Sequence, residues 1–296
     1  MKGTKIRNAR FLFALSMALF GTLGLFVRNI PVSSEELALY RAILAAVLIA
    51  GYMLITKRKI TFSNMKRDAI LLFISGAAIG VNWIFLFEAY KYTTVSAATL
   101  SCYFAPVIVT IASPILFHER LTGRKVLCFA MSTVGIVLIT VTGGITGGAN
   151  DFIGILFGLG SAVLYATAIL LNKVIKTAED IQRTFLQFVA AILVLLPYVA
   201  MKGITVDTMH TAGWINLLIV GFIHTGINYC LYFTALKDLP GQQIAILSYI
   251  DPLVAVLISV TVLGEPMTTW QAVGGILILG FTLWNEILPK NNSNPT

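Results

Sequence analysis

The chain has 296 residues, of which 57% are hydrophobic and only 11% are charged, and its mean hydropathy is +0.87. A soluble domain carries roughly 25% charged residues, because water must solvate its surface. This composition therefore excludes a water-soluble globule and predicts a protein that is solvated mainly by lipid.

The net charge of +8 does not indicate a nucleic-acid partner. Nucleic-acid binding requires Lys and Arg residues gathered into a patch or stripe, whereas here they form short clusters between apolar runs, as at Lys57, Arg58 and Lys59. The three cysteines lie inside apolar stretches at spacings that fit no metal site. We therefore expect no nucleic acid, no metal and no cofactor.

Ten apolar runs are long enough to cross a membrane as helices, which takes about 20 residues. In chain order they are 10–28, 37–56, 69–88, 94–117, 124–142, 153–172, 184–201, 212–233, 242–263 and 269–288. The runs are too long and too uniformly apolar for the alternating strands of a membrane barrel. The sequence predicts an all-α integral membrane protein with ten transmembrane helices.

The distribution of basic residues between alternate loops predicts the orientation, because cytoplasmic loops are enriched in Lys and Arg. One side would hold 17 of the 21 Lys and Arg residues. The other would hold Arg28, Lys91 and Lys202, and Arg41 falls inside a span. This asymmetry predicts a multi-pass protein of the bacterial plasma (cytoplasmic) membrane with both termini in the cytoplasm.

An internal repeat relates the two halves of the chain. A shift of 146 residues aligns the third and fourth spans with the eighth and ninth, with nine identities over the 40 positions from 80 to 119. The identities include residue types that membrane spans use sparingly, namely Asn82 with Asn228, Lys91 with Lys237, Pro106 with Pro252 and Glu119 with Glu265, and they also include Tyr103 with Tyr249. A shift of 145 pairs Ser16 with Ser161 and Arg28 with Lys173. We predict two five-helix repeats, 11–142 and 153–288. Because five is odd, the second repeat would be inverted, as in many secondary transporters.

The motifs of the chain resemble those of the ten-helix EamA-type transporters of the drug/metabolite transporter superfamily. They include Tyr103-Phe104-Ala105-Pro106, its counterpart Tyr249-Ile250-Asp251-Pro252, and Gly264-Glu265-Pro266. The resemblance covers nearly the whole chain, although Asp251 departs from the pattern of the first half, which has Ala105 there. It implies a central cavity lined by spans 1, 3, 4, 6, 8 and 9, and transport of small metabolites, commonly amino acids or related compounds and often outward.

Asp251 is the principal candidate site residue, because polar groups at membrane depth are costly and usually functional. It precedes Pro252, which removes a backbone hydrogen bond and loosens the helix. A carboxyl group there can carry a proton or bind a substrate amine. The alternative is a structural hydrogen bond to a neighbouring helix.

Further candidates for substrate binding are polar or aromatic residues within the spans. Asn82 with Trp83 and Asn228 with Tyr229 combine an amide with an aromatic ring, which suits a polar solute. Trp83 could instead anchor at the lipid interface, and the amides could bond between helices. Tyr103, Tyr249, Ser101 and Ser248 flank the two prolines, and His224 lies inside the eighth span. A lone buried histidine is more often structural.

Arg41 and Glu88 are predicted at similar depth, where they could pair as a gate or as a static brace, or Arg41 could extend to the interface. No catalytic or nucleotide-binding motif is present, which argues against an enzyme. The sequence therefore predicts a secondary transporter of a small polar metabolite that works by alternating access. We favour an exporter of amino acids or related compounds, with protons as a possible coupling ion and a monomer or homodimer as the assembly. The alternatives are an importer of a vitamin, nucleobase or quaternary amine, and a non-transporting membrane sensor or assembly protein.

Overall fold

A computed structural model of the chain describes residues 2–57, 66–117, 122–146, 149–175, 180–204, 209–236, 238–239 and 241–287. Some residues used above lie outside these ranges, namely Glu119 of the repeat and Arg58, Lys59, Arg120, Lys176, Lys237 and Lys290 of the charge count.

Every element within the described ranges is a helix. In chain order they are α1 (Lys2–Gly21), α2 (Leu23–Val27), α3 (Ser34–Ile55), α4 (Lys66–Tyr92), α5 (Val95–Cys102), α6 (Ala105–Phe117), α7 (Gly123–Thr146), α8 (Ala149–Val174), α9 (Asp180–Lys202), α10 (Thr211–Leu218), the π-helix η2 (Ile219–Ile227), α11 (Asn228–Leu236), α12 (Gly241–Ser248), α13 (Ile250–Thr261) and α14 (Thr269–Ile287).

The all-helical class is confirmed, and helices occupy each of the ten predicted runs. Within the described residues, seven helical segments are long and apolar enough to cross a membrane, and α13 is a shorter apolar helix. The seven are Arg7–Val27, Ser34–Ile55, Asp68–Tyr92, Val95–Phe117, Asn150–Val174, Ile181–Lys202 and Thr211–Ala235. The chain is therefore a multi-pass membrane protein, and the count of ten crossings stays a prediction.

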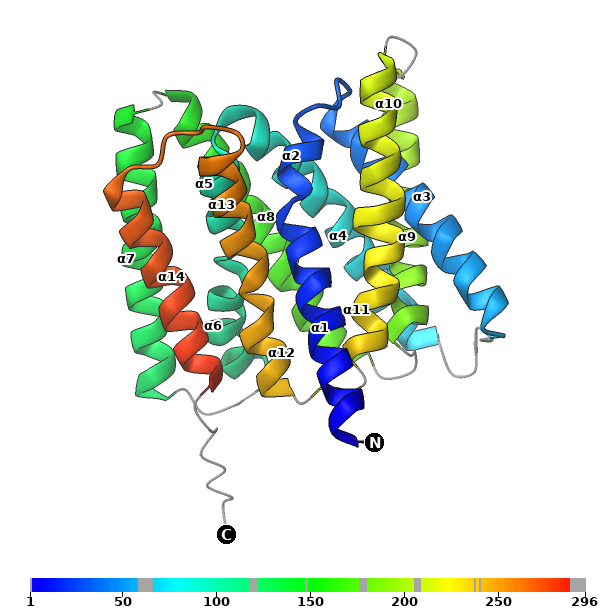
Figure 1. Ribbon diagram of the computed structural model, residues 1–296, viewed down its shortest axis with the longest axis horizontal. Coiled ribbons are helices and arrows are strands. Elements are labelled where there is room, and N and C mark those ends of the chain that lie inside the picture. The colour runs from blue at the N-terminus through cyan, green and yellow to red at the C-terminus, as the bar shows by residue number, and fades with distance from the viewer. Residues whose placement is uncertain are drawn as a thin grey trace.

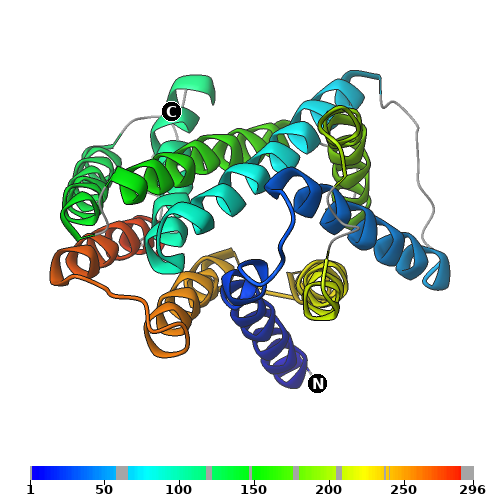
Figure 2. The ribbon, with the colours of Figure 1, turned by 90° about the horizontal axis from the view of Figure 1, so that it is seen from above.

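The helices form one bundle in which α4 and α8 lie side by side through the middle (Figures 1 and 2). The helices α7 and α14 pack together at one side, and α3 and α9 pack together at the other. The start of α1 and the end of α14 lie at the same end of the bundle, which we call the terminal end (Figure 1). The short helix α2 and the start of α10 lie at the opposite end.

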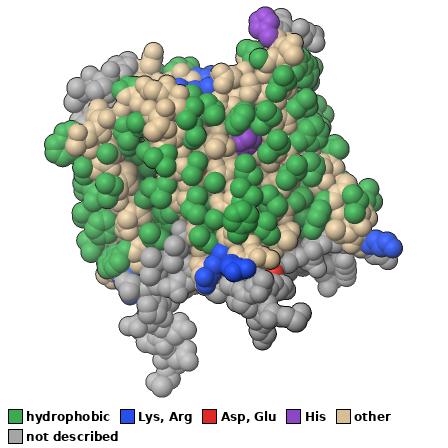
Figure 3. Space-filling model, viewed as in Figure 1, with side chains coloured by type: hydrophobic (Ala, Val, Ile, Leu, Met, Phe, Trp, Pro, Cys, Tyr) green, Lys and Arg blue, Asp and Glu red, His purple; other side chains and the backbone are tan. Residues whose placement is uncertain are grey.

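The outer surface of the bundle is apolar, as contact with lipid requires. In Figure 3 hydrophobic side chains cover most of the visible face, and the Lys and Arg side chains visible there lie toward its two ends. Large hydrophobic side chains are widely exposed, among them Leu54 at 79% and Ile276 at 70%. An apolar surface of this extent marks a membrane-facing protein.

Local sequence explains several helix starts. The Ser33 hydroxyl accepts a hydrogen bond from the Glu36 backbone N–H, and the Glu36 carboxylate accepts one from the Ser33 N–H. This reciprocal cap starts α3. Thr94 caps α5 in one direction, because its hydroxyl accepts a hydrogen bond from the Ala97 backbone N–H.

Close helix packing depends on glycine. A side chain at Gly76 or Gly80 of α4 would meet α9, and one at Gly154 or Gly158 of α8 would meet Thr93 or Ser101. These glycines, spaced four residues apart, therefore serve close packing inside the bundle.

Candidate functional site

Four interrupted helices meet inside the bundle, and we call their meeting point the central junction. The first interruption is at Gly21–Thr22 between α1 and α2, the second at Tyr103–Phe104 between α5 and α6, and the third at Tyr249 between α12 and α13. The fourth is the π-helix η2. The second and third precede Pro106 and Pro252, which have no N–H to donate. Irregular backbone at membrane depth is tolerated where protein buries it or where it lines a cavity, and transporters place their binding sites at such points.

A hydrogen bond between Tyr103 and Asp251 connects the second and third interruptions within the junction. The Tyr103 hydroxyl donates to Asp251 Oδ2 over 2.6 Å. The two residues are 148 positions apart in sequence, one in each half of the chain. The junction thus pairs one acidic group with one phenol.

The interruption between α1 and α2 contacts two other parts of the junction, α13 and η2. A Cβ atom on Gly21 would lie 2.5 Å from the Asp251 carbonyl oxygen, so only glycine allows the two backbones to approach this closely. The next residue, Thr22, shares a hydrogen bond of 2.8 Å with Nε2 of His224 in η2. His224 is buried at 2% exposure and its ring lies 4.8 Å from that of Phe26. The candidate His224 therefore has a hydroxyl partner inside the junction.

The two candidate asparagines make corresponding contacts. Asn82 Nδ2 donates to the carbonyl oxygen and to the hydroxyl of Ser161, each over 2.7 Å. Asn228 Nδ2 donates to the carbonyl oxygen of Ser16 over 3.1 Å. Because Asn82 aligns with Asn228 and Ser161 with Ser16 in the predicted repeat, the two contacts are equivalent. Each links a helix of one half to a helix of the other.

Arg41 of α3 lies beside the junction, fully inside the protein. Its side chain is 2% exposed, and Nε donates to the Thr225 hydroxyl of η2 over 2.7 Å. The guanidinium carbon lies 4.4 Å from the ring centroid of Trp83 and 5.7 Å from that of Phe87. Trp83, at 5% exposure, thus faces the interior, and its alternative interpretation as a lipid-interface anchor is wrong.

The expected pair of Arg41 with Glu88 is not formed. Glu88 lies near the end of α4, where its carboxylate accepts a hydrogen bond from Lys91 over 2.9 Å. Lys91 is three residues further on and so reaches Glu88 on the same helix face. Arg41 points instead toward η2, and it does not extend to the interface.

The remaining candidates flank the junction, and the two serines among them bond to their own helices. The Ser101 hydroxyl donates to the Ala97 carbonyl oxygen, and the Ser248 hydroxyl to that of Ile244. Tyr249 is half-buried and directly precedes α13. Substrate binding by the predicted residues stays a prediction.

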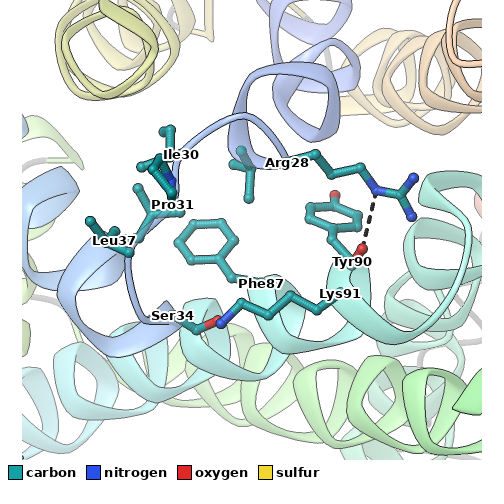
Figure 4. A pocket seen from close by; sticks show the side chains of 10 residues that line it. Arg28, Ile30, Pro31, Ser34, Leu37, Phe87, Tyr90 and Lys91 are labelled. Atoms are coloured by element: carbon teal, nitrogen blue, oxygen red, sulfur yellow. Dashed lines mark hydrogen bonds between the residues drawn. The ribbon is translucent and has the colours of Figure 1, made fainter. Parts of the chain in front are cut away.

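A cavity of about 470 Å³ opens at the opposite end, between α2, the start of α3 and the end of α4 (Figure 4). Its lining combines apolar side chains with two cations and comprises Val27, Arg28, Ile30, Pro31, Val32, Ser34, Leu37, Phe87, Tyr90 and Lys91. Phe87 also lies next to Arg41, so this cavity borders the junction.

Arg28 anchors a network at the rim of this cavity. It pairs with Glu265 and donates to the carbonyl oxygens of Tyr90 and Thr93. Glu265 also accepts hydrogen bonds from the Val95 backbone N–H and from the Ser259 hydroxyl. The network therefore connects the end of α2, the start of α5 and the end of α13.

The sequence did not indicate Thr22, Thr225 or Arg28 as candidate site residues. A threonine in an apolar span usually bonds to its own helix, as Thr234 does with Cys230, so its sequence carries no signal of a partner elsewhere. Among the described residues no cluster of three or more His, Cys, Asp or Glu residues could hold a metal.

An apolar helical bundle with broken helices around buried polar side chains is typical of membrane transport proteins. The EamA-like transporter family matches residues 8–141 and 152–285, and the chain belongs to this family. The two matches show that the family domain occurs twice. Family and relatives indicate a transporter rather than an enzyme.

Relatives occur in bacteria, archaea and animals. The chain is 29% identical to the uncharacterized transporter YxxF of Bacillus subtilis, over 95% of this chain and 90% of that protein. It is 27% identical to an uncharacterized transporter of Archaeoglobus fulgidus, over 95% and 98%. It is 23% identical to solute carrier family 35 member G1 of Mus musculus, over 90% and 75%. A solved crystal structure shares the fold with a TM-score of 0.63 and 19% identity, covering 93% of this chain and 96% of the other.

Proposed function

We propose that the protein is a secondary transporter that exports amino acids or related small polar compounds by alternating access around the central junction. The observation that carries this proposal is the hydrogen bond between Tyr103 and Asp251, which joins the two halves of the chain where two proline-broken helices meet. A carboxyl group held there can bind a substrate amine or carry a proton. The outward direction rests on the family resemblance.

Many transporters that work by alternating access are built from two inverted halves. The equivalent contacts of Asn82 with Ser161 and of Asn228 with Ser16 support such a relation. Each contact crosses between the halves, so rocking one half against the other would act on both contacts.

Equivalent polar contacts at the two ends of the bundle support alternating gates. At the opposite end Arg28 pairs with Glu265, which also bonds Ser259. At the aligned positions of the other repeat, Lys173 donates to the Ser113 hydroxyl over 2.8 Å. Lys173 is the repeat equivalent of Arg28, and Ser113 that of Ser259. We propose that one network opens while its equivalent closes.

The membrane and its orientation belong to the same proposal. We place the protein in a bacterial cytoplasmic membrane as a monomer or homodimer, with the terminal end facing the cytoplasm. The asymmetry of Lys and Arg between alternate loops supports this orientation.

Counterflow in proteoliposomes tests the function. Vesicles preloaded with one amino acid should accumulate the labelled form of the same compound, and this uptake should require the protein. A panel of vitamins, nucleobases and quaternary amines run in parallel tests import of those solutes by the same site. The absence of counterflow for every solute would contradict transport.

The variant Asp251→Asn tests the role of the carboxyl group. If Asp251 carries the proton, we expect the variant to lose the pH dependence of transport while the protein still folds, because asparagine keeps the shape of the side chain. Asp151→Asn is the matched control, since Asp151 lies in the first turn of α8 and not at the junction. Unchanged pH dependence in Asp251→Asn would remove Asp251 from this role.

A further inference from the structure

Arg41 is a buried cation without an anionic partner. Among the described residues no carboxylate pairs with it, and its Nη1 atom has no hydrogen-bond partner although it is buried. Its recorded contacts are the Thr225 hydroxyl at Nε and the faces of the Trp83 and Phe87 rings.

These contacts do not compensate a buried charge. Removing a guanidinium group from water costs more than one neutral hydrogen bond and one or two aromatic faces return. An ionisable group at membrane depth without a protein partner is therefore expected to serve a ligand. An anion is the ligand that would satisfy both the charge and Nη1.

The shape of the group selects the type of anion. Arginine presents parallel N–H donors in a rigid plane, which match the two oxygens of a carboxylate. The hydroxyl of Thr225 holds Nε, and Trp83 covers one face of the plane, so the guanidinium is held in a fixed orientation.

A cavity at the opposite end lies close to this group. The cavity in Figure 4 has a volume of about 470 Å³, which suits a solute of amino-acid size. Its lining includes Arg28, which pairs with Glu265, and Lys91, which pairs with Glu88, and no acidic residue. Its wall includes Phe87, the ring that lies 5.7 Å from the Arg41 guanidinium carbon.

A carboxyl group of the same junction has the opposite charge. Asp251 accepts a hydrogen bond from Tyr103 and forms no ion pair with Arg41. A solute with a carboxylate at one end and an amine at the other would complement the two groups.

We propose that Arg41 is the carboxylate-binding residue of the transport site and that the transported solutes carry a carboxylate. This inference rests on the proposed transport function and adds the chemical class of the solute.

Thermal-shift measurements on the full chain in detergent test the inference. The probes are the L-amino acids, each compared with its amide and with the amine that lacks the carboxylate. We expect acids to stabilise the wild type and their amides and amines not to do so. The variant Arg41→Gln should weaken acid binding by about a hundredfold, the effect of removing one member of a buried charge pair. Arg41→Lys should weaken it by about tenfold, equivalent to one hydrogen bond to a charged group.

Trp83 gives a second measurement that does not require Arg41→Gln to fold. Trp214, Trp270 and Trp284 are replaced by phenylalanine, so that Trp83 is the single tryptophan that remains. A carboxylate that pairs with Arg41 weakens the cation–π contact and should change the Trp83 emission in a saturable manner. Arg10→Gln is the control, since it removes an exposed cation in the first half of α1, where Arg10 bonds Gln243, and should leave this response unchanged.

The inference is overturned if amides stabilise the protein as well as acids do, if Arg41→Gln keeps the preference for acids, or if no acid affects Tm or Trp83 emission. Counterflow separates this failure from failure of the proposed function. Transport of solutes without a carboxylate would leave the transporter in place and remove only the role of Arg41.

Discussion

The third and eighth spans align in the predicted repeat, yet their backbones differ. The third span is the uninterrupted α-helix α4, whereas the eighth contains the π-helix η2 between α10 and α11. The positions that align are Ala78 and Ile79 in α4 and His224 and Thr225 in η2. The Thr225 hydroxyl donates to the Val220 carbonyl oxygen, five residues back, and accepts from Arg41. The π-helix thus occurs in the repeat that has the polar residues His224 and Thr225 at these two positions. Single π-helical turns are frequent at functional sites.

The two spans also pack differently on their neighbours. A Cβ atom on Gly76 of α4 would lie 2.4 Å from the Gln187 carbonyl oxygen of α9, which is backbone. A Cβ atom on Gly226 of η2 would lie 2.8 Å from Leu48 Cδ1 and 3.0 Å from Leu48 Cβ of α3, which are side-chain atoms. A change of rotamer can move Leu48 Cδ1, whereas the Gln187 carbonyl oxygen moves only with its helix. Gly76 therefore makes the more rigid contact of the two.

Gly76→Ala should produce the largest effect. We expect a loss of about 3 kcal/mol in the free energy of unfolding, because overpacking against backbone forces two helices apart. Unfolding by titration with SDS, followed by circular dichroism, measures the loss. Gly51→Ala is the control, since no atom lies within 4 Å of the added methyl group. Equal stability of the two variants would contradict the rigid contact.

Thr225→Val should have an intermediate effect. The change keeps the shape of the side chain but leaves Nε of the buried Arg41 without its acceptor, at an expected cost of about 1–2 kcal/mol. Thr225→Ser keeps the hydroxyl and should remain near the wild type in the same titration. A valine variant as stable as the serine variant would show that Arg41 does not depend on this bond.

The smallest expected effect is the difference in stability between the variants Asn82→Ala and Asn228→Ala. Asn82 donates to two acceptors of Ser161, whereas Asn228 donates to one, and its Oδ1 atom has no partner among the described residues. We expect Asn82→Ala to destabilise the protein more than Asn228→Ala, by about 0.5 kcal/mol, the average value of one interhelical hydrogen bond in a membrane. The same SDS titration compares the two variants directly. The reverse order would mean that the number of donated bonds does not govern these equivalent sites.

Part of the site followed from local sequence. A proline removes a backbone donor, so helix breaks before Pro106 and Pro252 could be expected, although Pro114 and Pro197 lie inside continuous helices. The polar character of Asp251 between apolar neighbours was also evident from the sequence. The contact of Tyr103 with Asp251 was not predictable, because it joins residues 148 positions apart. The same holds for Arg41, which was expected near Glu88 and instead meets Thr225, 184 positions away.

The sequence by itself determined that lipid surrounds the protein, that its elements are helices, and where along the chain those helices lie. Each of these depends on local hydrophobicity and on capping residues within a few positions. It also contained the repeat, since a repeat is a property of residue order. Only the tertiary structure decided which polar side chains meet. Glycine contacts, the π-helix and the rotamers of long side chains determine how closely helices approach and where Arg41 points. These are properties of packing between distant segments, and packing left Arg41 buried beside two aromatic rings without an anion.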